Sequence, residues 1–205
     1  KDASVSGTEV TIDLFIENLG SETANSLTLT DDLDAAFGTG NYTVTSAPAL
    51  IVDPGTLASN PAFDGSMDLH VLNPGAYLDP GATAQGRFVV DVTTESDQGF
   101  GFGVYQNRAT ATGMSAAGVV ISDVSDSGID PDPNSNNNPS DAGEDDPTVI
   151  VLGGNPSVAI AKKAYVDGTS VTLDFAIENV GDVTLTNFSL ADSLNPVFGS
   201  GNYSV

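Results

Sequence analysis

Apolar and polar residues alternate between residues 9 and 17 of this chain, with Phe15 as the one apolar residue on the polar face. Successive side chains of a β-strand point to opposite faces, so the alternation predicts a strand with one buried and one polar face. The positions assigned to the buried face are Val10, Ile12, Leu14 and Ile16. The same pattern returns near the end of the sequence, at Val171, Leu173, Phe175 and Ile177.

Other short strands are predicted where apolar or β-branched residues lie between turn-forming residues. These segments are 27–29, 41–45, 84–92, 104–112, 118–123, 148–152 and 157–161, with 188–190 as a second copy of the first. Residues 46–81 are rich in Pro, Gly, Asn and Asp, which predicts long loops with short extended pieces. No segment carries the apolar stripe of an amphipathic helix over three turns. The pattern predicts an all-β fold, an immunoglobulin-like β-sandwich with long acidic loops.

The chain contains an internal repeat. Residues 7–44 align with residues 168–205 without a gap, at an offset of 161 positions, and 19 of the 38 pairs are identical. A repeat of this length is a whole domain in a tandem array. We therefore expect one β-sandwich repeat at 1–154, lacking its first strand, and the beginning of the next, homologous repeat at 155–205. Its first strand would lie within 155–161.

Several motifs carry a resemblance to a known family. Residues 156–164 read Pro-Ser-Val-Ala-Ile-Ala-Lys-Lys-Ala, and the following strand closes in Asn179-Val180-Gly181. Later motifs are Leu78-Asp79-Pro80-Gly81, the stretch 105–113 and the acidic stretch 122–133. Together they resemble the conserved-repeat domain of prokaryotic surface proteins, although Val180 stands where that family has Thr. The resemblance implies immunoglobulin-like modules strung along an extracellular or cell-surface protein, and it implies no ligand.

The charge of the chain limits its partners. The sequence has 28 acidic and five basic residues, a formal net charge of −23. Nucleic acids and anionic membranes are bound through cationic surfaces, so neither is expected as a partner. No apolar run is long enough to span a membrane, so we expect no membrane insertion. Because the chain has no cysteine, stability must come from a large core or from another cross-link, such as a metal.

The acidic residues concentrate between 123 and 146, and no Lys or Arg occurs from residue 109 to residue 161. Oxygen side chains at every second residue of 130–136 would share one side of an extended segment, an arrangement suited to Ca²⁺. Several Ca²⁺ sites are therefore predicted. The candidate ligands are Asp123, Asp126, Asp130, Asp132, Asn134, Asn136, Asp141, Glu144, Asp145 and Asp146. The alternatives are a solvated acidic linker and the general acidity of a salt-adapted protein.

No catalytic constellation is apparent. The chain has no Trp and no Cys, and His70 is its only histidine. A glycosidase cleft lined by aromatic residues and a nucleophile–histidine pair therefore both lack support, and we expect no enzymatic activity. A lysine–asparagine cross-link beside a buried acid is a further candidate device, with Lys162 or Lys163 joined to Asn107.

These patterns predict a structural module of a filament, an adhesin stalk or a surface layer, stabilised by Ca²⁺ and assembled head to tail. The expected partners are neighbouring copies of the repeat, in the same chain or in other subunits joined by strand exchange. The alternative is an adhesin domain whose 46–81 loops bind a carbohydrate, another surface ligand or a protein.

Overall fold

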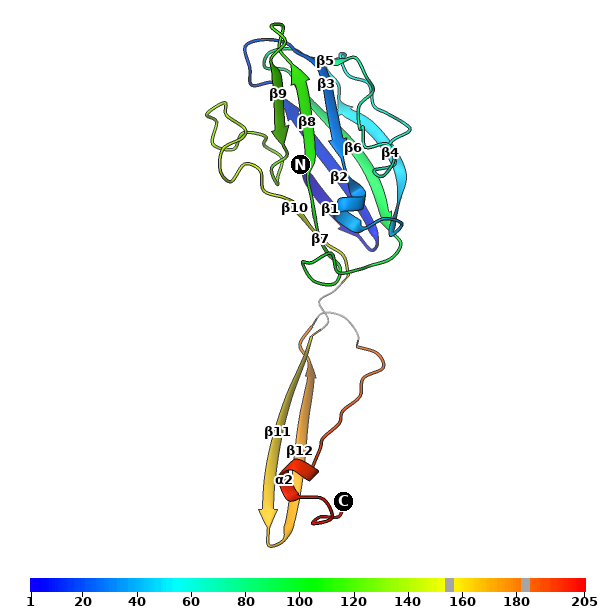
Figure 1. Cartoon of the computed structure of the whole chain (residues 1–205), viewed down its shortest axis with the longest axis vertical. Coiled ribbons are helices and arrows are strands. Elements are labelled where there is room, and N and C mark those ends of the chain that lie inside the picture. Colours follow the sequence, from blue (N-terminus) through cyan, green and yellow to red (C-terminus); the bar gives the residue numbers. More distant parts are fainter. Residues whose placement is uncertain (154–156, 182–184) are drawn as a thin grey trace. The chain divides into compact units, whose positions relative to one another are not determined.

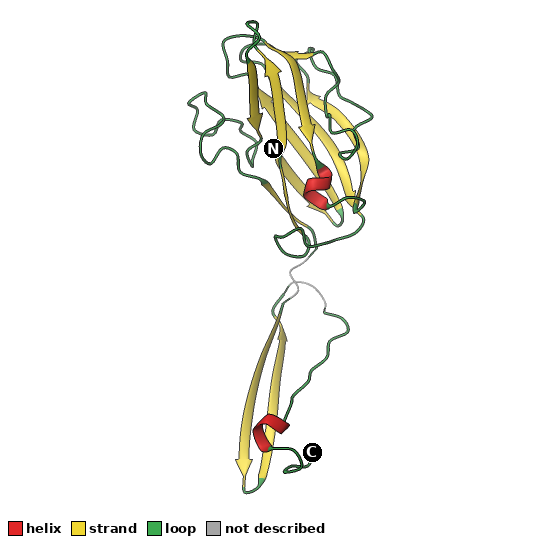
Figure 2. Ribbon diagram, in the orientation of Figure 1, coloured by secondary structure: helices red, strands yellow, loops and turns green. Residues whose placement is uncertain are grey.

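A computed structural model describes residues 1–153, 157–181 and 185–205. The chain falls into two compact units, Lys1–Gly153 and Gly154–Val205 (Figure 1). Strands dominate both of them, and the described helices are two single turns, α1 (Leu33–Phe37) and α2 (Asn195–Phe198) (Figure 2). The prediction of an all-β fold is confirmed.

The first unit contains two four-stranded antiparallel sheets. In order across the first sheet, the strands are β1 (Asp2–Ser6), β2 (Glu9–Glu17), β6 (Thr83–Val92) and β4 (Tyr42–Val52). In the second sheet they are β5 (Ala76–Leu78), β3 (Ala24–Asp31), β8 (Ala109–Met114) and β9 (Val120–Val124). A separate pair joins β7 (Val104–Asn107) to β10 (Thr148–Val151).

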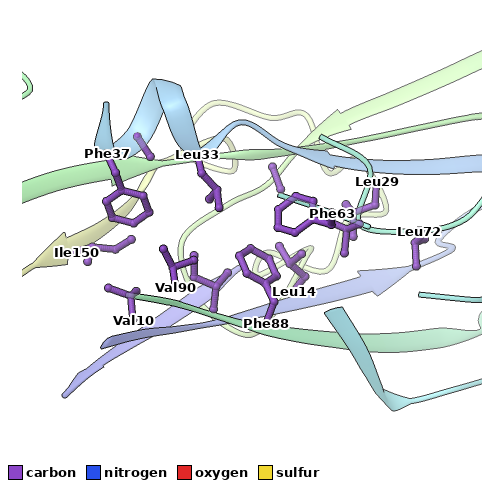
Figure 3. Packing of buried hydrophobic residues seen from close by; sticks show 14 of the residues in the cluster. Val10, Leu14, Leu29, Leu33, Phe37, Phe63, Leu72, Phe88, Val90 and Ile150 are labelled. Atoms are coloured by element: carbon purple, nitrogen blue, oxygen red, sulfur yellow. The ribbon is translucent and has the colours of Figure 1, made fainter. Parts of the chain in front are cut away.

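One hydrophobic core receives side chains from both four-stranded sheets (Figure 3). Val10 and Ile12 of β2 are fully buried, as the alternation predicted, and Leu29 of β3 belongs to the same cluster. The rings of Phe63 and Phe88 meet with their centroids 4.9 Å apart. Burying a side chain of this size contributes about 1.5–3 kcal/mol, so this shared core is the main stabilising element of the unit.

Helix α1 follows β3 and was not predicted. Asp32 caps its first turn by accepting a hydrogen bond from the backbone nitrogen of Ala35 at 2.9 Å. Gly38 ends it with a φ of 84°, a conformation that favours glycine. The helix places Phe37 in the core, 5.1 Å from the ring of Tyr105. A single turn is too short to show an apolar stripe, so the sequence pattern could not reveal it.

Several strand boundaries differ from the prediction, among them the end of the predicted strand 41–45 and the extent of the predicted strand 104–112. The expected loop after residue 45 begins later, because β4 continues through Pro48 to Val52 with three register shifts against β6. Such irregularities allow a strand to accommodate a proline, which has no amide hydrogen to donate. The expected strand 104–112 is two strands, since the chain leaves β7 at Arg108 and enters the second sheet as β8.

The second unit is a hairpin of β11 (Val158–Asp167) and β12 (Ser170–Asn179), followed by α2. Three apolar residues of β12 are uncovered, with exposed fractions of 39% for Val171, 36% for Phe175 and 45% for Ile177. The predicted strand at 188–190 does not form. In the first unit the corresponding strand β3 is held by β5 and β8, and these 205 residues hold no second copy of either strand.

Candidate functional site

The predicted cation ligands lie at the end of β9 and in the loop that joins β9 to β10. Asp123 is in β9, whereas the other nine residues are in the loop (residues 125–147). Figure 1 shows this loop beside β9, and the Ser140 hydroxyl joins the two by donating to Asp123 Oδ1 at 3.2 Å. The loop therefore packs back on the strand that precedes it.

The first half of the loop is turned, not extended. Ser135 and Asn137 have φ values of 58° and 63°, in the left-handed region. Asp132 is buried, and its two carboxylate oxygens accept hydrogen bonds from the backbone nitrogens of Asn136 at 3.3 Å and Asn137 at 2.8 Å. The predicted row of ligands along one side of an extended segment is therefore wrong, because local side-chain hydrogen bonds fold the chain into successive turns.

Five of the ten predicted ligands join in one hydrogen-bonded network. Asp130 Oδ1 accepts from the backbone nitrogen of Asp132, and Asn134 Oδ1 accepts from that of Asn136. The Asn136 side chain then donates to Asp141 Oδ2 at 2.6 Å. These oxygens accept hydrogen bonds within the protein, so the loop's own polar side chains hold this half of it in its turns.

A second group surrounds Asp123. Partial burial raises the pKa of the Asp123 carboxyl, and the negative charges of Asp145 and Glu144 raise it further, while the hydrogen bond from Ser140 opposes the rise. Glu144 is 4% exposed as a whole residue, and neither of its carboxylate oxygens has a hydrogen-bond partner among the described residues. A buried carboxylate without a hydrogen-bond partner is costly, so a bound cation at Glu144 would offset an unfavourable burial.

The two remaining predicted ligands close the loop. Asp126 Oδ1 accepts a hydrogen bond from the backbone nitrogen of Asp146 at 3.2 Å. Next to this contact, Arg108 Nε donates to the carbonyl oxygen of Asp145 at 3.0 Å. The arginine therefore binds the backbone here and brings one positive charge to the end of the acidic loop.

The ten residues do not form one metal centre. In residues 1–153, 157–181 and 185–205, no three His, Cys, Asp or Glu side chains converge in a way that would hold a metal ion. Asp145 and Glu144 both lie close enough to Asp123 for their charges to raise its pKa. Their oxygens are hard donors, which suit Ca²⁺ and not zinc or copper.

A groove beside the open edge of β2 was not predicted. It has a volume of about 280 Å³ and a largely apolar lining that includes Leu14, Leu27, Leu29, Leu78, Ala109 and Ile121. Strand β1 pairs with β2 only as far as Asp13, so the backbone of β2 from residue 14 to residue 17 borders this groove without a strand partner on that side in the described structure. Edges of this kind accept an added strand.

Comparisons with known proteins place the chain in no group: no family model matches it, and no curated protein matches it. Among the described helices, none has the length and apolar character needed to cross a membrane.

Proposed function

We propose that this chain is a structural module of a long extracellular repeat protein, such as a filament, an adhesin stalk or a surface-layer component. Each repeat would be an immunoglobulin-like β-sandwich, and the repeats would follow one another head to tail. The extracellular location is supported by the resemblance of the motifs to surface-protein repeats and by the acidic composition. The observation that carries the proposal is that the two units share individual contacts as well as sequence.

These shared contacts occur at the same offset as the sequence repeat. Lys1 Nζ lies 2.5 Å from Asp31 Oδ2 in the first unit, and Lys162 Nζ lies 2.6 Å from Asp192 Oδ2 in the second. In the same way, the rings of Phe37 and Tyr42 are 5.8 Å apart, and those of Phe198 and Tyr203 are 5.9 Å apart. The same ion pair and the same ring contact therefore form at corresponding positions of both units.

The second unit has the apolar face of a domain without the strands that cover it. Val10 and Ile12 are fully buried in the first unit, whereas their counterparts Val171 and Leu173 on β12 are not. An apolar strand face of this kind is stable only when a second layer packs on it. The arrangement supports a chain in which further repeat sequence completes each domain.

The experiment is to complete the second repeat with the chain's own sequence. Because Val205 aligns with Val44, residues 45–153 are appended directly after Val205. We expect amide hydrogens of β12 to become as protected from exchange as those of β2, and two unfolding events of equal extension when the protein is stretched by its ends. Unprotected β12 amides, with the first unit still folded, would refute a tandem module.

The groove beside β2 supports a specific mode of contact with neighbouring chain. In the second unit, β11 is 10 residues long, and its first four residues, Val158–Ala161, pair with residues 176–179. The corresponding strand β1 has five residues, so the matching edge at residues 15–18 is the one that borders the groove. A strand with the pattern of Val158–Ala161, from preceding chain or from another copy, would fill it.

Calcium binding is proposed for the acidic loop at a single place, around Glu144 and Asp123. The support is the buried Glu144 carboxylate, whose two oxygens have no hydrogen-bond partner among the described residues. In addition, partial burial raises the pKa of Asp123, and the negative charges of Asp145 and Glu144 raise it further. A bound cation would supply the missing positive charge and would stabilise the folded state in proportion to its concentration.

A further inference from the structure

Three polar side chains meet in the interior of the first unit. Lys1, Asp31 and Asn107 are 4%, 1% and 2% exposed, respectively. Lys1 precedes β1, Asp31 ends β3 and Asn107 ends β7, so the three come from separate elements. Lys1 Nζ contacts Asp31 Oδ2 at 2.5 Å, with both side chains fully buried.

The strand register brings Asn107 to this pair. Asn107 is paired with Thr148 across the β7–β10 ladder, and the Thr148 hydroxyl donates to the carbonyl oxygen of Lys1 at 3.0 Å. On the other side, Asp31 is paired with Ala109, two residues beyond Asn107. Asn107 Nδ2 and Asp31 Oδ1 are both buried without a well-aligned hydrogen-bond partner among the described residues. The cluster therefore holds an amine, a carboxyl and a carboxamide away from water.

Burial favours the uncharged forms of this cluster. It lowers the pKa of the Lys1 side chain, against the opposing charge and hydrogen bond of Asp31. It also raises the pKa of Asp31, although Lys1 and the side chain of Asn107 oppose the rise. Both shifts move a proton from the amine to the carboxyl. A neutral amine is a nucleophile, and a protonated carboxyl group is a proton donor.

We propose that Lys1 Nζ and Asn107 Cγ become joined by an amide bond inside the folded domain, with Asp31 transferring the proton and ammonia released. Lys1 Nζ adds to the carboxamide carbon while Asp31 protonates the carboxamide oxygen. The tetrahedral intermediate then collapses: the bond from Cγ to Nδ2 breaks, and a proton from Nζ passes through Asp31 to the departing nitrogen. As the carbonyl group re-forms, the proton on its oxygen returns to Asp31. Atoms balance, since an amine and a carboxamide give a substituted amide and ammonia, and no oxidant or reductant takes part.

The side chain of Asn107 is the acyl donor in this reaction, and Asp31 is the proton carrier. Joining Lys1 to Asp31 instead would expel water and would need a second acid to protonate the departing hydroxyl group. The neighbouring Asp32 is exposed and accepts a hydrogen bond from the backbone of Ala35 at the start of α1. With Asp31 as the proton carrier, the close fixed contact supplies the orientation that makes such a reaction effective.

The second unit provides an internal control, because it has the lysine and the aspartate without the asparagine. Lys162 and Asp192 repeat the contact of Lys1 and Asp31, but the 161-residue offset puts the counterpart of Asn107 beyond Val205. One cross-link is therefore expected in these 205 residues, and it involves Lys1, not Lys162 or Lys163.

Mass spectrometry of the full chain tests this directly. The protein is produced with a short leader before Lys1, so that the α-amine of Lys1 is in a peptide bond. We expect an intact mass about 17 Da below that of the sequence, the mass of one ammonia. After trypsin digestion, residues 1–87 should remain linked to residues 88–108, because an acylated Lys1 is not cleaved. A full sequence mass would overturn the proposal. A loss of about 17 Da confined to 88–108 would also overturn it, because an internal imide of Asn107 accounts for that result.

Variants assign the roles. Lys1→Met and Asn107→Ala should each show the full mass of their own sequence, without loss of ammonia. Lys162→Met should still show the loss of ammonia. Asp31→Asn keeps the shape of the acid and should abolish linkage in a domain whose β2 and β6 amides remain protected from exchange. Linkage that persists in folded Asp31→Asn would remove Asp31 from the reaction, and linkage of Lys1 to Asp31 with loss of about 18 Da would remove Asn107. The presence or absence of the cross-link does not bear on the tandem-module proposal, because that proposal is tested on the second unit.

Discussion

The backbone of Gly65 lies directly against the side chain of Leu33. Leu33 donates its backbone amide to the carbonyl oxygen of Gly65 at 2.8 Å, and a Cβ atom placed on Gly65 would sit 2.4 Å from Leu33 Cδ1. Leu33 is fully buried at the start of α1. The contact fastens the loop after β4 to the core, and it leaves no room for a side chain at residue 65.

Replacing Gly65 with alanine should therefore destabilise the first unit strongly. Two effects add: the backbone has a φ of +72°, and the new methyl group collides with Leu33. Gly75→Ala is the matched control, because Gly75 has a φ of +92° but no atom within 4 Å of its Cβ position. We expect the control to lower the unfolding free energy by about 1 kcal/mol and Gly65→Ala to lower it by a further 1–3 kcal/mol, both measured by urea unfolding. Equal losses in the two variants would mean that the Leu33 contact is unimportant.

The loop carrying Gly65 should also make the domain sensitive to acid. Asp64 Oδ1 accepts backbone hydrogen bonds from Ser66, Met67 and Asp68, each at 2.9 Å. The hydrogen bond from Asp68 is the largest of the effects that lower the pKa of Asp64. A lowered folded-state pKa gives stability that is complete above the unfolded value of about 3.9 and is lost as the pH falls through the folded value.

We therefore expect Asp64→Asn to flatten the fall in unfolding free energy below about pH 4. Urea midpoints across this range provide the measurement, in moderately high salt so that long-range charge repulsion is screened. If the variant and the parent lose stability with the same pH slope, the turn at Asp64 does not hold an ionised carboxylate.

Features set by neighbouring residues could be predicted from the sequence, whereas features set by distant strands could not. Val10 and Ile12 could be assigned to the core because the two-residue period of a strand is a local property. The division of β7 from β8 at Arg108 could not, because no Gly or Pro marks it and the change of sheet is decided by the partners β10 and β3. Predicting the segment 130–136 as extended failed because the turn at Asp132 arises from its own side-chain hydrogen bonds.

The Lys1–Asp31 pair could have been found from the sequence. Both residues are identical to their counterparts at the 161-residue offset, Lys162 and Asp192, and a lysine preserved in such an acidic chain is a strong signal. What the sequence does not contain is the burial of the pair, because that depends on how β1, β3 and β7 come together. The repeat therefore identifies the two residues, and only the packing of the three strands shows that they are buried together.

The Glu144 group should respond to calcium in a way that separates binding from screening. Without calcium, Glu144→Gln removes a buried, unpaired charge, so the variant should be more stable than the parent by roughly 1 kcal/mol. At a calcium concentration ten times the dissociation constant, binding should raise the unfolding free energy of the parent by about 1.4 kcal/mol and that of the variant by less. Thermal unfolding in CaCl₂, MgCl₂ and EDTA at equal ionic strength provides the measurement. Equal calcium shifts in both proteins would show screening alone, and no shift in the parent would exclude the site.

Extending β1 should stabilise the first unit. Ala161 precedes Lys162 as the next residue upstream would precede Lys1, so residues 157–161 (Ser-Val-Ala-Ile-Ala) are placed directly before Lys1. Side chains alternate along a strand, so the valine and isoleucine face the same side as the buried Lys1, toward the groove beside β2. Burial of the two apolar side chains is worth about 3–6 kcal/mol before the cost of ordering the added residues.

That ordering cost is large, so the net gain expected in the unfolding free energy is about 1–2 kcal/mol. The matched control is the extension Ser-Asp-Ala-Asp-Ala, which has the same length and backbone but places two carboxylates in an apolar groove. It should leave the stability unchanged or lower it, and exchange of the β2 amides at residues 14–17 should slow only with the apolar extension. If the two extensions behave alike, the groove does not receive a strand, and contact between successive repeats must use another surface.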